Sequence, residues 1–169
     1  MSDWMQGVHT DTVSTGLLIG RLVVGLGMAA HGSQKLFGWF GGKGLTGTTA
    51  YFESLGFRPG RPFAILAGLG EFTSGLLVAL GFLGPVGPAL MMAVMIVAAA
   101  QSWNKGFFAM NGGIELPLLY ASAALALSFI GPGRFSLDAA LGIAPWSNLK
   151  LVAIAVGVAV VGAVGSLAV

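Results

Sequence analysis

Eight polar side chains lie within, or at the ends of, otherwise apolar segments of this chain. They supply two carboxylates, a guanidinium, an ammonium, an imidazole, two amides and an indole. The imidazole and the carboxylates can exchange protons with a bound molecule, and the other groups can donate hydrogen bonds to it. These candidate ligand-binding residues are Arg21, His31, Gln34, Lys35, Glu71, Gln101, Trp103 and Glu115.

Helical spacing places several of these residues on shared faces. At ~100° per residue, Arg21 and Lys35 fall on one stripe of a first helix, together with small residues. We expect Arg21 to pair with Glu71, because ionisable residues inside membranes usually face the bundle interior and pair with one another. A second expected contact places His31 or Lys35 near Glu115. Around Glu71, the second helix carries a stripe of small residues that we expect to face other helices: Ala64, Gly68, Gly75 and Ala79.

Two interpretations of this cluster remain open on the sequence. The residues can form structural ion pairs that fix helix register, with the Lys35 ammonium extending to the membrane interface. Alternatively, they line a polar cavity for a small head group such as a quinone, and His31 or Glu115 carries protons. Two further charged residues, Arg134 and Asp138, are predicted to have structural roles.

The composition indicates where the chain resides. Its 169 residues are 8% charged and 56% hydrophobic, with a mean hydropathy of +0.88. A soluble domain carries roughly a quarter charged residues, so the polar residues here are too few to cover a soluble surface. Alternating β-barrel patterning is absent, and we therefore predict an all-α integral membrane protein. A nucleic-acid partner is excluded because no basic cluster interleaved with aromatic residues occurs.

Five apolar segments each approach the ~20 residues that cross a ~30 Å hydrocarbon core as a helix. They predict an antiparallel four-helix transmembrane bundle plus a fifth, C-terminal transmembrane helix, in a single membrane domain over residues 1–169. Because Val, Ala, Ile, Leu and Gly dominate the fifth helix, we expect it to be peripheral to the polar cluster. The predicted spans are residues 16–37, 62–82, 85–103, 114–130 and 149–169.

The connection between the first two spans is long and carries several cations. Tyr51 and Phe52 belong to a helical repeat of apolar residues, so we predict an amphipathic surface helix over residues 46–56 that closes at Gly56. An unstructured loop is the alternative. By the positive-inside rule, the cations weakly favour a cytoplasmic loop and an outer N-terminus, in a bacterial cell (inner) membrane.

Several cofactor motifs are excluded. The chain contains no cysteine, so it can hold neither an iron–sulfur cluster nor a disulfide. His31 is the one histidine predicted inside the membrane, which leaves no bis-histidine haem site, and no Glu-x-x-His pair offers a metal site. The G-x-G-x-x-G pattern at residues 42–47 follows a predicted membrane helix instead of a strand, so it does not indicate nucleotide binding.

Four motifs between Leu17 and Leu141 form a recognisable set. They are R-L-x-x-G-x-x-M-x-x-H-G-x-Q-K-L-F-G from Arg21, T-x-Y-F-x-x-L-G from Thr49, G-L-G-E-x-x-x-G from Gly68 and G-P-G-R-F-S-L-D from Gly131. Together they resemble the DoxX family, small bacterial membrane proteins related to DoxD. The polar residues that match the family pattern by position are Arg21, His31, Gln34, Lys35, Glu71, Glu115 and Asp138.

This resemblance implies a four-helix membrane bundle, from which the fifth predicted helix departs. It also implies respiratory or sulfur redox chemistry, because related proteins are described as small subunits of thiosulfate:quinone oxidoreductase. Another branch is described as assembling with soluble antioxidant or sulfurtransferase enzymes. We therefore expect a membrane subunit, alone or as a homo-oligomer, that binds a quinone and partners a redox or sulfur-metabolism enzyme. The alternative is a non-catalytic membrane scaffold or assembly factor, and a small-solute carrier ranks third.

Overall fold

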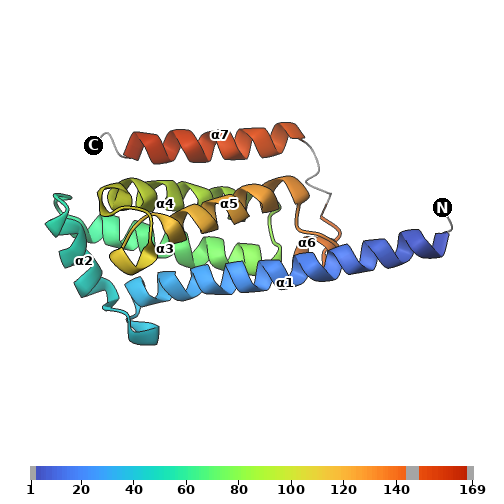
Figure 1. Cartoon of the computed structure of the whole chain (residues 1–169), viewed down its shortest axis with the longest axis horizontal. Coiled ribbons are helices and arrows are strands. Elements are labelled where there is room, and N and C mark those ends of the chain that lie inside the picture. The colour runs from blue at the N-terminus through green and yellow to red at the C-terminus, as the bar shows by residue number, and fades with distance from the viewer. Residues whose placement is uncertain (1–2, 144–148, 167–169) are drawn as a thin grey trace.

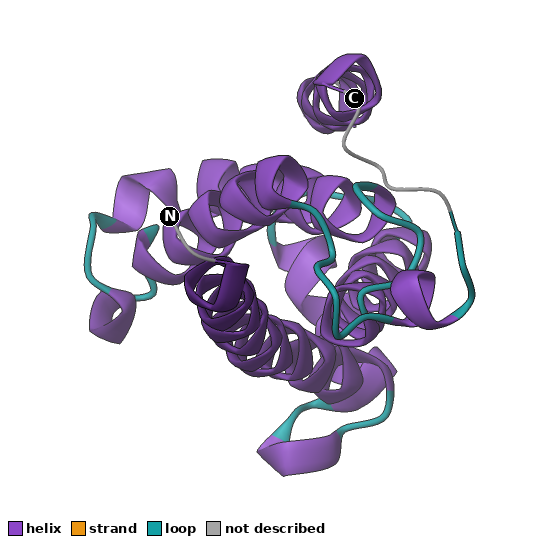
Figure 2. Cartoon of the chain, turned by 90° about the vertical axis from the view of Figure 1, so that its right-hand side faces the viewer, coloured by secondary structure: helices purple, strands orange, loops and turns teal. Residues whose placement is uncertain are grey.

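The chain folds into helices, and the computed structural model describes residues 3–143 and 149–166 (Figure 1, Figure 2). Every regular element among these residues is helical. The long helices are α1 (Asp3–Leu36), α3 (Gly60–Leu80), α4 (Val86–Ser102), α5 (Glu115–Ile130) and α7 (Leu149–Ser166). The short elements are α2 (Gly44–Ser54), α6 (Leu137–Ala140) and the 3₁₀ turns η1 (Trp39–Gly41), η2 (Trp103–Lys105) and η3 (Ala109–Asn111).

Three helical stretches are long and apolar enough to cross a membrane: Asp11–Leu36, Gly60–Leu80 and Val86–Lys105. Two shorter apolar helices, Glu115–Ile130 and Leu149–Val164, accompany them. These helices confirm the predicted class, an all-α protein of membrane character. Of the predicted fifth span, residues 167–169 lie outside the described part of the chain.

The first helix starts earlier than the sequence predicted. It begins at Asp3, whereas the predicted span began at residue 16, and in Figure 1 its first turns extend past the other helices. Hydropathy identifies the residues that are apolar enough for the membrane core. A helix can continue beyond them into polar sequence where no helix-breaking residue occurs. No proline, which would break a helix, occurs between Asp3 and Leu36.

The helices pack side by side in a simple order. Helix α1 packs on α3, α3 on α4, and α4 on α5, while α7 lies along α4 with a smaller contact to α5 (Figure 1, Figure 2). Methionine and alanine side chains of α4 dominate the core where α4 meets its neighbours. Helix α2 packs across the end of the bundle that lies opposite the N-terminus.

Glycines allow α1 and α3 to touch through their backbones. A β-carbon built on Gly25 would lie 2.6 Å from the carbonyl oxygen of Gly75, and one built on Gly32 would lie 2.7 Å from that of Gly68. Real β-carbons do not approach so closely, so these positions accept no larger residue without separating the helices. The small stripe predicted on the second helix does face its neighbours: Ala64, Gly68, Glu71, Gly75 and Ala79 are all buried.

A short helix forms in the long connection, at Gly44–Ser54, about two residues before the predicted range of 46–56. It closes at Gly56 as predicted, where φ is +96°. The N–H of Gly56 donates to the carbonyl of Glu53 and the N–H of Phe57 to that of Phe52, both at 3.1 Å. This is the paired bonding by which a left-handed glycine ends a helix.

Candidate functional site

The main buried ion pair joins the last turn of α1 to the middle of α3. The Lys35 ammonium lies 2.5 Å from both carboxylate oxygens of Glu71. The Glu71 side chain is 4% exposed and that of Lys35 is 32% exposed. The carboxylate is therefore enclosed, while part of the lysine side chain remains accessible.

The predicted partner of Glu71 was wrong. Arg21 lies at the other end of the α1–α3 pair, where a β-carbon on Gly81 would overlap its guanidinium. The two helices are antiparallel, and the glycine contacts set their register so that Glu71 lies level with the last turns of α1. The sequence did not reveal that register, because the long connection through α2 leaves the offset between the helices free.

A cavity of about 370 Å³ lies beside the Lys35–Glu71 pair. Its polar lining comes from these two residues together with Gln101 and Ser102 at the end of α4. Small and branched side chains of α3 and α4 form much of the apolar wall. Gly162 and Ala163 of α7 also line the cavity. The fifth helix therefore forms part of this wall, which corrects the expectation that it would be peripheral to the polar cluster.

Aromatic residues from α2 and the start of α3 close one side of the cavity. Tyr51, Phe52, Phe57 and Phe63 all line it. The ring centroids of Phe57 and Phe63 are 4.9 Å apart, and those of Phe52 and Phe57 are 5.7 Å apart. Aromatic pairs at such distances stabilise each other beyond simple burial. Sequence reasoning assigned no site role to these rings, although their clustering around the α2–α3 connection could have suggested one.

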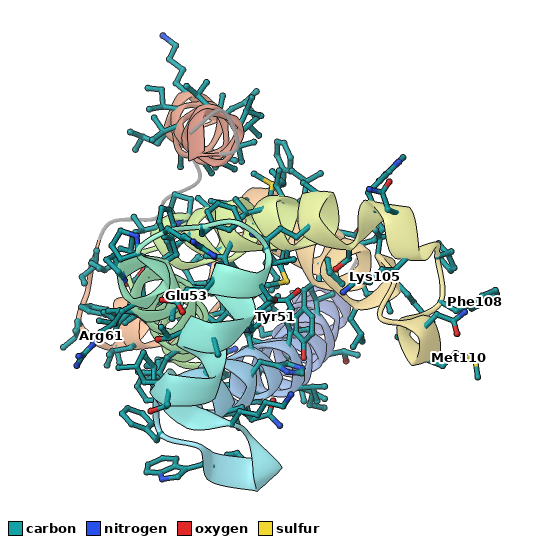
Figure 3. The ribbon with its side chains drawn as sticks, turned by 90° about the vertical axis from the view of Figure 1, so that its left-hand side faces the viewer. Tyr51, Glu53, Arg61, Lys105, Phe108 and Met110 are labelled. Carbon is teal, nitrogen blue, oxygen red and sulfur yellow. The ribbon has the colours of Figure 1, made fainter. Side chains whose placement is uncertain are left out.

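Helix α2 is fastened over this end of the cavity by polar contacts. The Thr48 hydroxyl donates to the carbonyl of Lys35 at 3.2 Å, and the N–H of Gly60 donates to the Glu53 carboxylate at 3.4 Å. Farther out, the Lys105 ammonium lies 5.9 Å from the centroid of the Tyr51 ring. Figure 3, viewed from this end, shows the two side chains directed toward each other from separate elements.

The structure brings only some of the predicted ligand residues together. Lys35, Glu71 and Gln101 line the cavity. The ring of His31 instead packs edge-on against Tyr120, with centroids 5.9 Å apart. Gln34 donates to the carbonyl of Phe40 at 3.2 Å.

Two further candidates lie in the connection between α4 and α5. Trp103 is 68% exposed at the start of η2. Glu115 accepts a hydrogen bond from the N–H of Ala109 at 2.8 Å, and the ammonium of Lys35 is bonded to Glu71. The hydrogen bonds of Glu115 and Lys35 thus go to partners other than each other, and of the expected pairing of His31 or Lys35 with Glu115, the structure shows the His31 ring against Tyr120, on the helix that Glu115 begins. A carboxylate at the start of a helix is well placed to order the preceding loop, and here it does so.

A second polar centre lies at the opposite end of the bundle. The Arg21 guanidinium donates to the carbonyl of Phe135 at 2.5 Å. The Asp138 carboxylate accepts from the N–H groups of Leu83 and Gly84, at 2.9 and 2.7 Å, and so ties the α3–α4 turn to α6. Arg134 forms an ion pair with Asp11, with both side chains more than half exposed. Each of these contacts joins segments that are distant in sequence.

Comparison with known proteins adds one finding to this geometry. The family model described as DoxX matches residues 16–109, which is more than half of the 169-residue chain and spans the Lys35–Glu71 pair, α2 and the cavity wall from α3 and α4. No curated protein and no solved structure matches the chain. On the strength of the family match, the chain belongs to the DoxX family.

Proposed function

We propose that this protein is a membrane subunit of a redox system and that its large cavity binds a quinone or a similar small head group. The observation that carries the proposal is the cavity itself. Its volume of about 370 Å³ lies within the range of ~300–1,000 Å³ that ligand sites occupy. It combines an apolar wall with a few polar groups at one side, which is the usual composition of such sites.

The polar side of the cavity favours a ligand with an acceptor oxygen. An ammonium group has three N–H donors. Two of the Lys35 donors are directed to the carboxylate oxygens of Glu71, which leaves the third for a ligand. A quinone carbonyl is such an acceptor, and the amide of Gln101 supplies a second donor on the same cavity. The rings of Phe57 and Phe63 provide flat apolar surface for the quinone ring.

The chain has no cysteine, so it cannot hold a cysteine-ligated iron–sulfur cluster, and the sequence shows no motif for another electron carrier. A redox or sulfur-metabolism enzyme must therefore deliver or remove electrons, while this subunit binds and orients the head group. This division of work agrees with the redox association that membership of the DoxX family implies.

The proposal includes a topology in the bilayer. Helices α1, α3, α4 and α5 cross as an antiparallel four-helix bundle and α7 crosses as a fifth span, in a bacterial inner membrane with α2 on the cytoplasmic face. Helix α5 has 16 residues, a length of roughly 24 Å, so it spans a ~30 Å core only with the help of its flanking turns. Exposed Trp103 precedes it and suits the membrane interface.

One observation favours the alternative of a non-catalytic scaffold. The charges of Lys35 and Glu71 already compensate each other, as in a purely structural ion pair. In that case the cavity is filled by lipid chains, and the exposed surfaces of the bundle serve assembly with a partner.

Two matched variants, each with one alanine of α4 replaced by leucine, test the proposal. Ala98 lines the cavity, whereas Ala100 on the same helix is exposed. The protein is reconstituted in lipid nanodiscs, and binding of a short-chain ubiquinone analogue is measured by native mass spectrometry. We expect the wild type and Ala100→Leu to bind alike and Ala98→Leu to bind at least about tenfold more weakly, since a leucine there occupies the apolar cavity. Equal binding by all three proteins, or none by the wild type, would favour the scaffold.

A further inference from the structure

The Arg21 guanidinium is buried with incomplete hydrogen bonding. The residue is 3% exposed, and one of its terminal nitrogens, Nη2, donates to the carbonyl of Phe135. The other two nitrogens, Nε and Nη1, have no hydrogen-bond partner among the described residues. A buried donor without a partner costs free energy, more so on a charged group, and native structures rarely leave one.

A small cavity adjoins this guanidinium. Its volume is about 10 Å³, which is roughly the space that a single water molecule requires. Arg21 is the one charged residue in its lining, and Gly81 forms part of the wall. Nη1 occupies the place where a side chain at Gly81 would begin, so this nitrogen lies at the wall of the cavity. The other lining residues include Gly84, Pro88, Leu127, Gly131 and Pro132.

The charge balance around the cavity favours a neutral occupant. Asp138 is the carboxylate that acts electrostatically on Arg21. It is 2% exposed, and its two oxygens accept from the N–H groups of Leu83 and Gly84. Asp138 therefore compensates the charge of Arg21 without bonding to it, because no ion pair joins the two among the described residues. An anion in the cavity would leave this buried centre with a net negative charge, which is costly.

We propose that this cavity is a binding site for one ordered water molecule, which accepts a hydrogen bond from Nη1 of Arg21. This water gives a hydrogen-bond partner to one of the two unpartnered nitrogens of a cation that the fold has removed from bulk water and lipid. The site lies at the end of the bundle opposite the quinone-type cavity and does not depend on the function proposed for that cavity.

The test is a structure of the wild-type protein in nanodiscs at a resolution that shows ordered water. A parallel crystal of the same protein is grown in a buffer in which bromide replaces chloride. We expect one density peak within hydrogen-bond distance of Nη1 and no anomalous bromide signal there. An empty cavity would overturn the proposal. A bromide signal would also overturn it, in favour of a small anion.

Variants make the assignment specific to Arg21 and to the cavity. Leu127→Phe fills the cavity and should remove the peak, whereas Leu125→Phe, at an exposed position of the same helix, should leave it in place. Arg21→Met should also lose the peak if the variant folds, and its persistence there would show that Arg21 does not hold the water. Because the Leu127 and Leu125 variants retain the arginine, the comparison stands even if Arg21→Met does not fold.

Discussion

Replacing Lys35 by methionine should destabilise the protein more than replacing Glu71 by leucine, although both changes break the same ion pair. The asymmetry follows from burial. Without Lys35, the Glu71 carboxylate stays enclosed with 4% of its side chain exposed and no compensating cation. Without Glu71, the Lys35 side chain, which is 32% exposed, can extend its ammonium farther into the cavity or to the interface.

The expected magnitudes differ by several kcal/mol. Stranding a buried charge by removing its partner costs ~3–5 kcal/mol, and we expect Lys35→Met to fall in this range. When a cation that keeps access to water loses its partner, the free energy of unfolding falls by only about 1 kcal/mol, and this is our estimate for Glu71→Leu. The double variant removes both charges and should recover most of the loss of the lysine variant, ending within about 1 kcal/mol of the wild type.

Unfolding in mixed micelles of a mild detergent and increasing dodecyl sulfate, followed by circular dichroism, measures these free energies. The matched control combines Arg21→Met with Glu71→Leu, whose effects should add because the two residues lie at opposite ends of the α1–α3 pair. Equal costs of the two single changes at Lys35 and Glu71, or additivity in their double variant, would refute the assigned pairing. Strong coupling between Arg21 and Glu71 would refute the register of the two helices.

Four further outcomes can be measured in the same preparations. Gly32→Val should cost at least ~2 kcal/mol in the unfolding assay by forcing α1 from α3, whereas Gly20→Val, which has open space around it, should stay within ~0.5 kcal/mol of the wild type. Asp138→Ala should cost ~1–3 kcal/mol, because it removes the acceptor of the buried N–H of Gly84 and of the part-buried N–H of Leu83. A chain ending before α7 should still insert, as a protease-protection assay would show, but should bind the quinone probe more weakly because one cavity wall is missing. His31→Gln should leave probe binding near the wild-type level, since its ring contacts Tyr120 and is not in the cavity lining; loss of binding would make His31 a ligand residue.

The sequence predicted the helices well because their determinants are local. Apolar runs near the length of a membrane span located α3, α4, α5 and α7 to within about two residues at nearly every described end. The end of α2 was equally accessible, since a glycine that follows a short amphipathic repeat marks a helix end. The start of α1 was missed because a hydropathy pattern reports the membrane-compatible part of a helix and not its full length.

The pairing of charged residues was less accessible because it depends on helix register. The sequence placed Lys35 and Glu71 in the interior of the same bundle, but the offset between α1 and α3 is set by backbone contacts at four glycines. When the depth of each residue in the membrane was estimated from its own helix alone, Arg21 was the expected partner of Glu71. The structure instead gives Arg21 its own environment, with Asp138 contributed by a segment more than one hundred residues away.

The cavity could not be predicted from polar residues alone, because most of its lining is apolar. Its aromatic wall comes from α2 and the start of α3, and α7 adds glycine and alanine, residue types that suggest packing when they are considered singly. Only the folded arrangement shows that these groups surround an open volume next to an ion pair.

The backbone contact between α1 and α3 also determines which parts of the protein can move. Two helices that touch through main-chain atoms at Gly25 and Gly32 can neither slide nor rotate against each other without collision. Lys35 and Glu71 are therefore carried by a single rigid unit, and their geometry is fixed before any molecule arrives. A change in the shape of the cavity therefore has to come from its other wall elements, α2, α4 and α7.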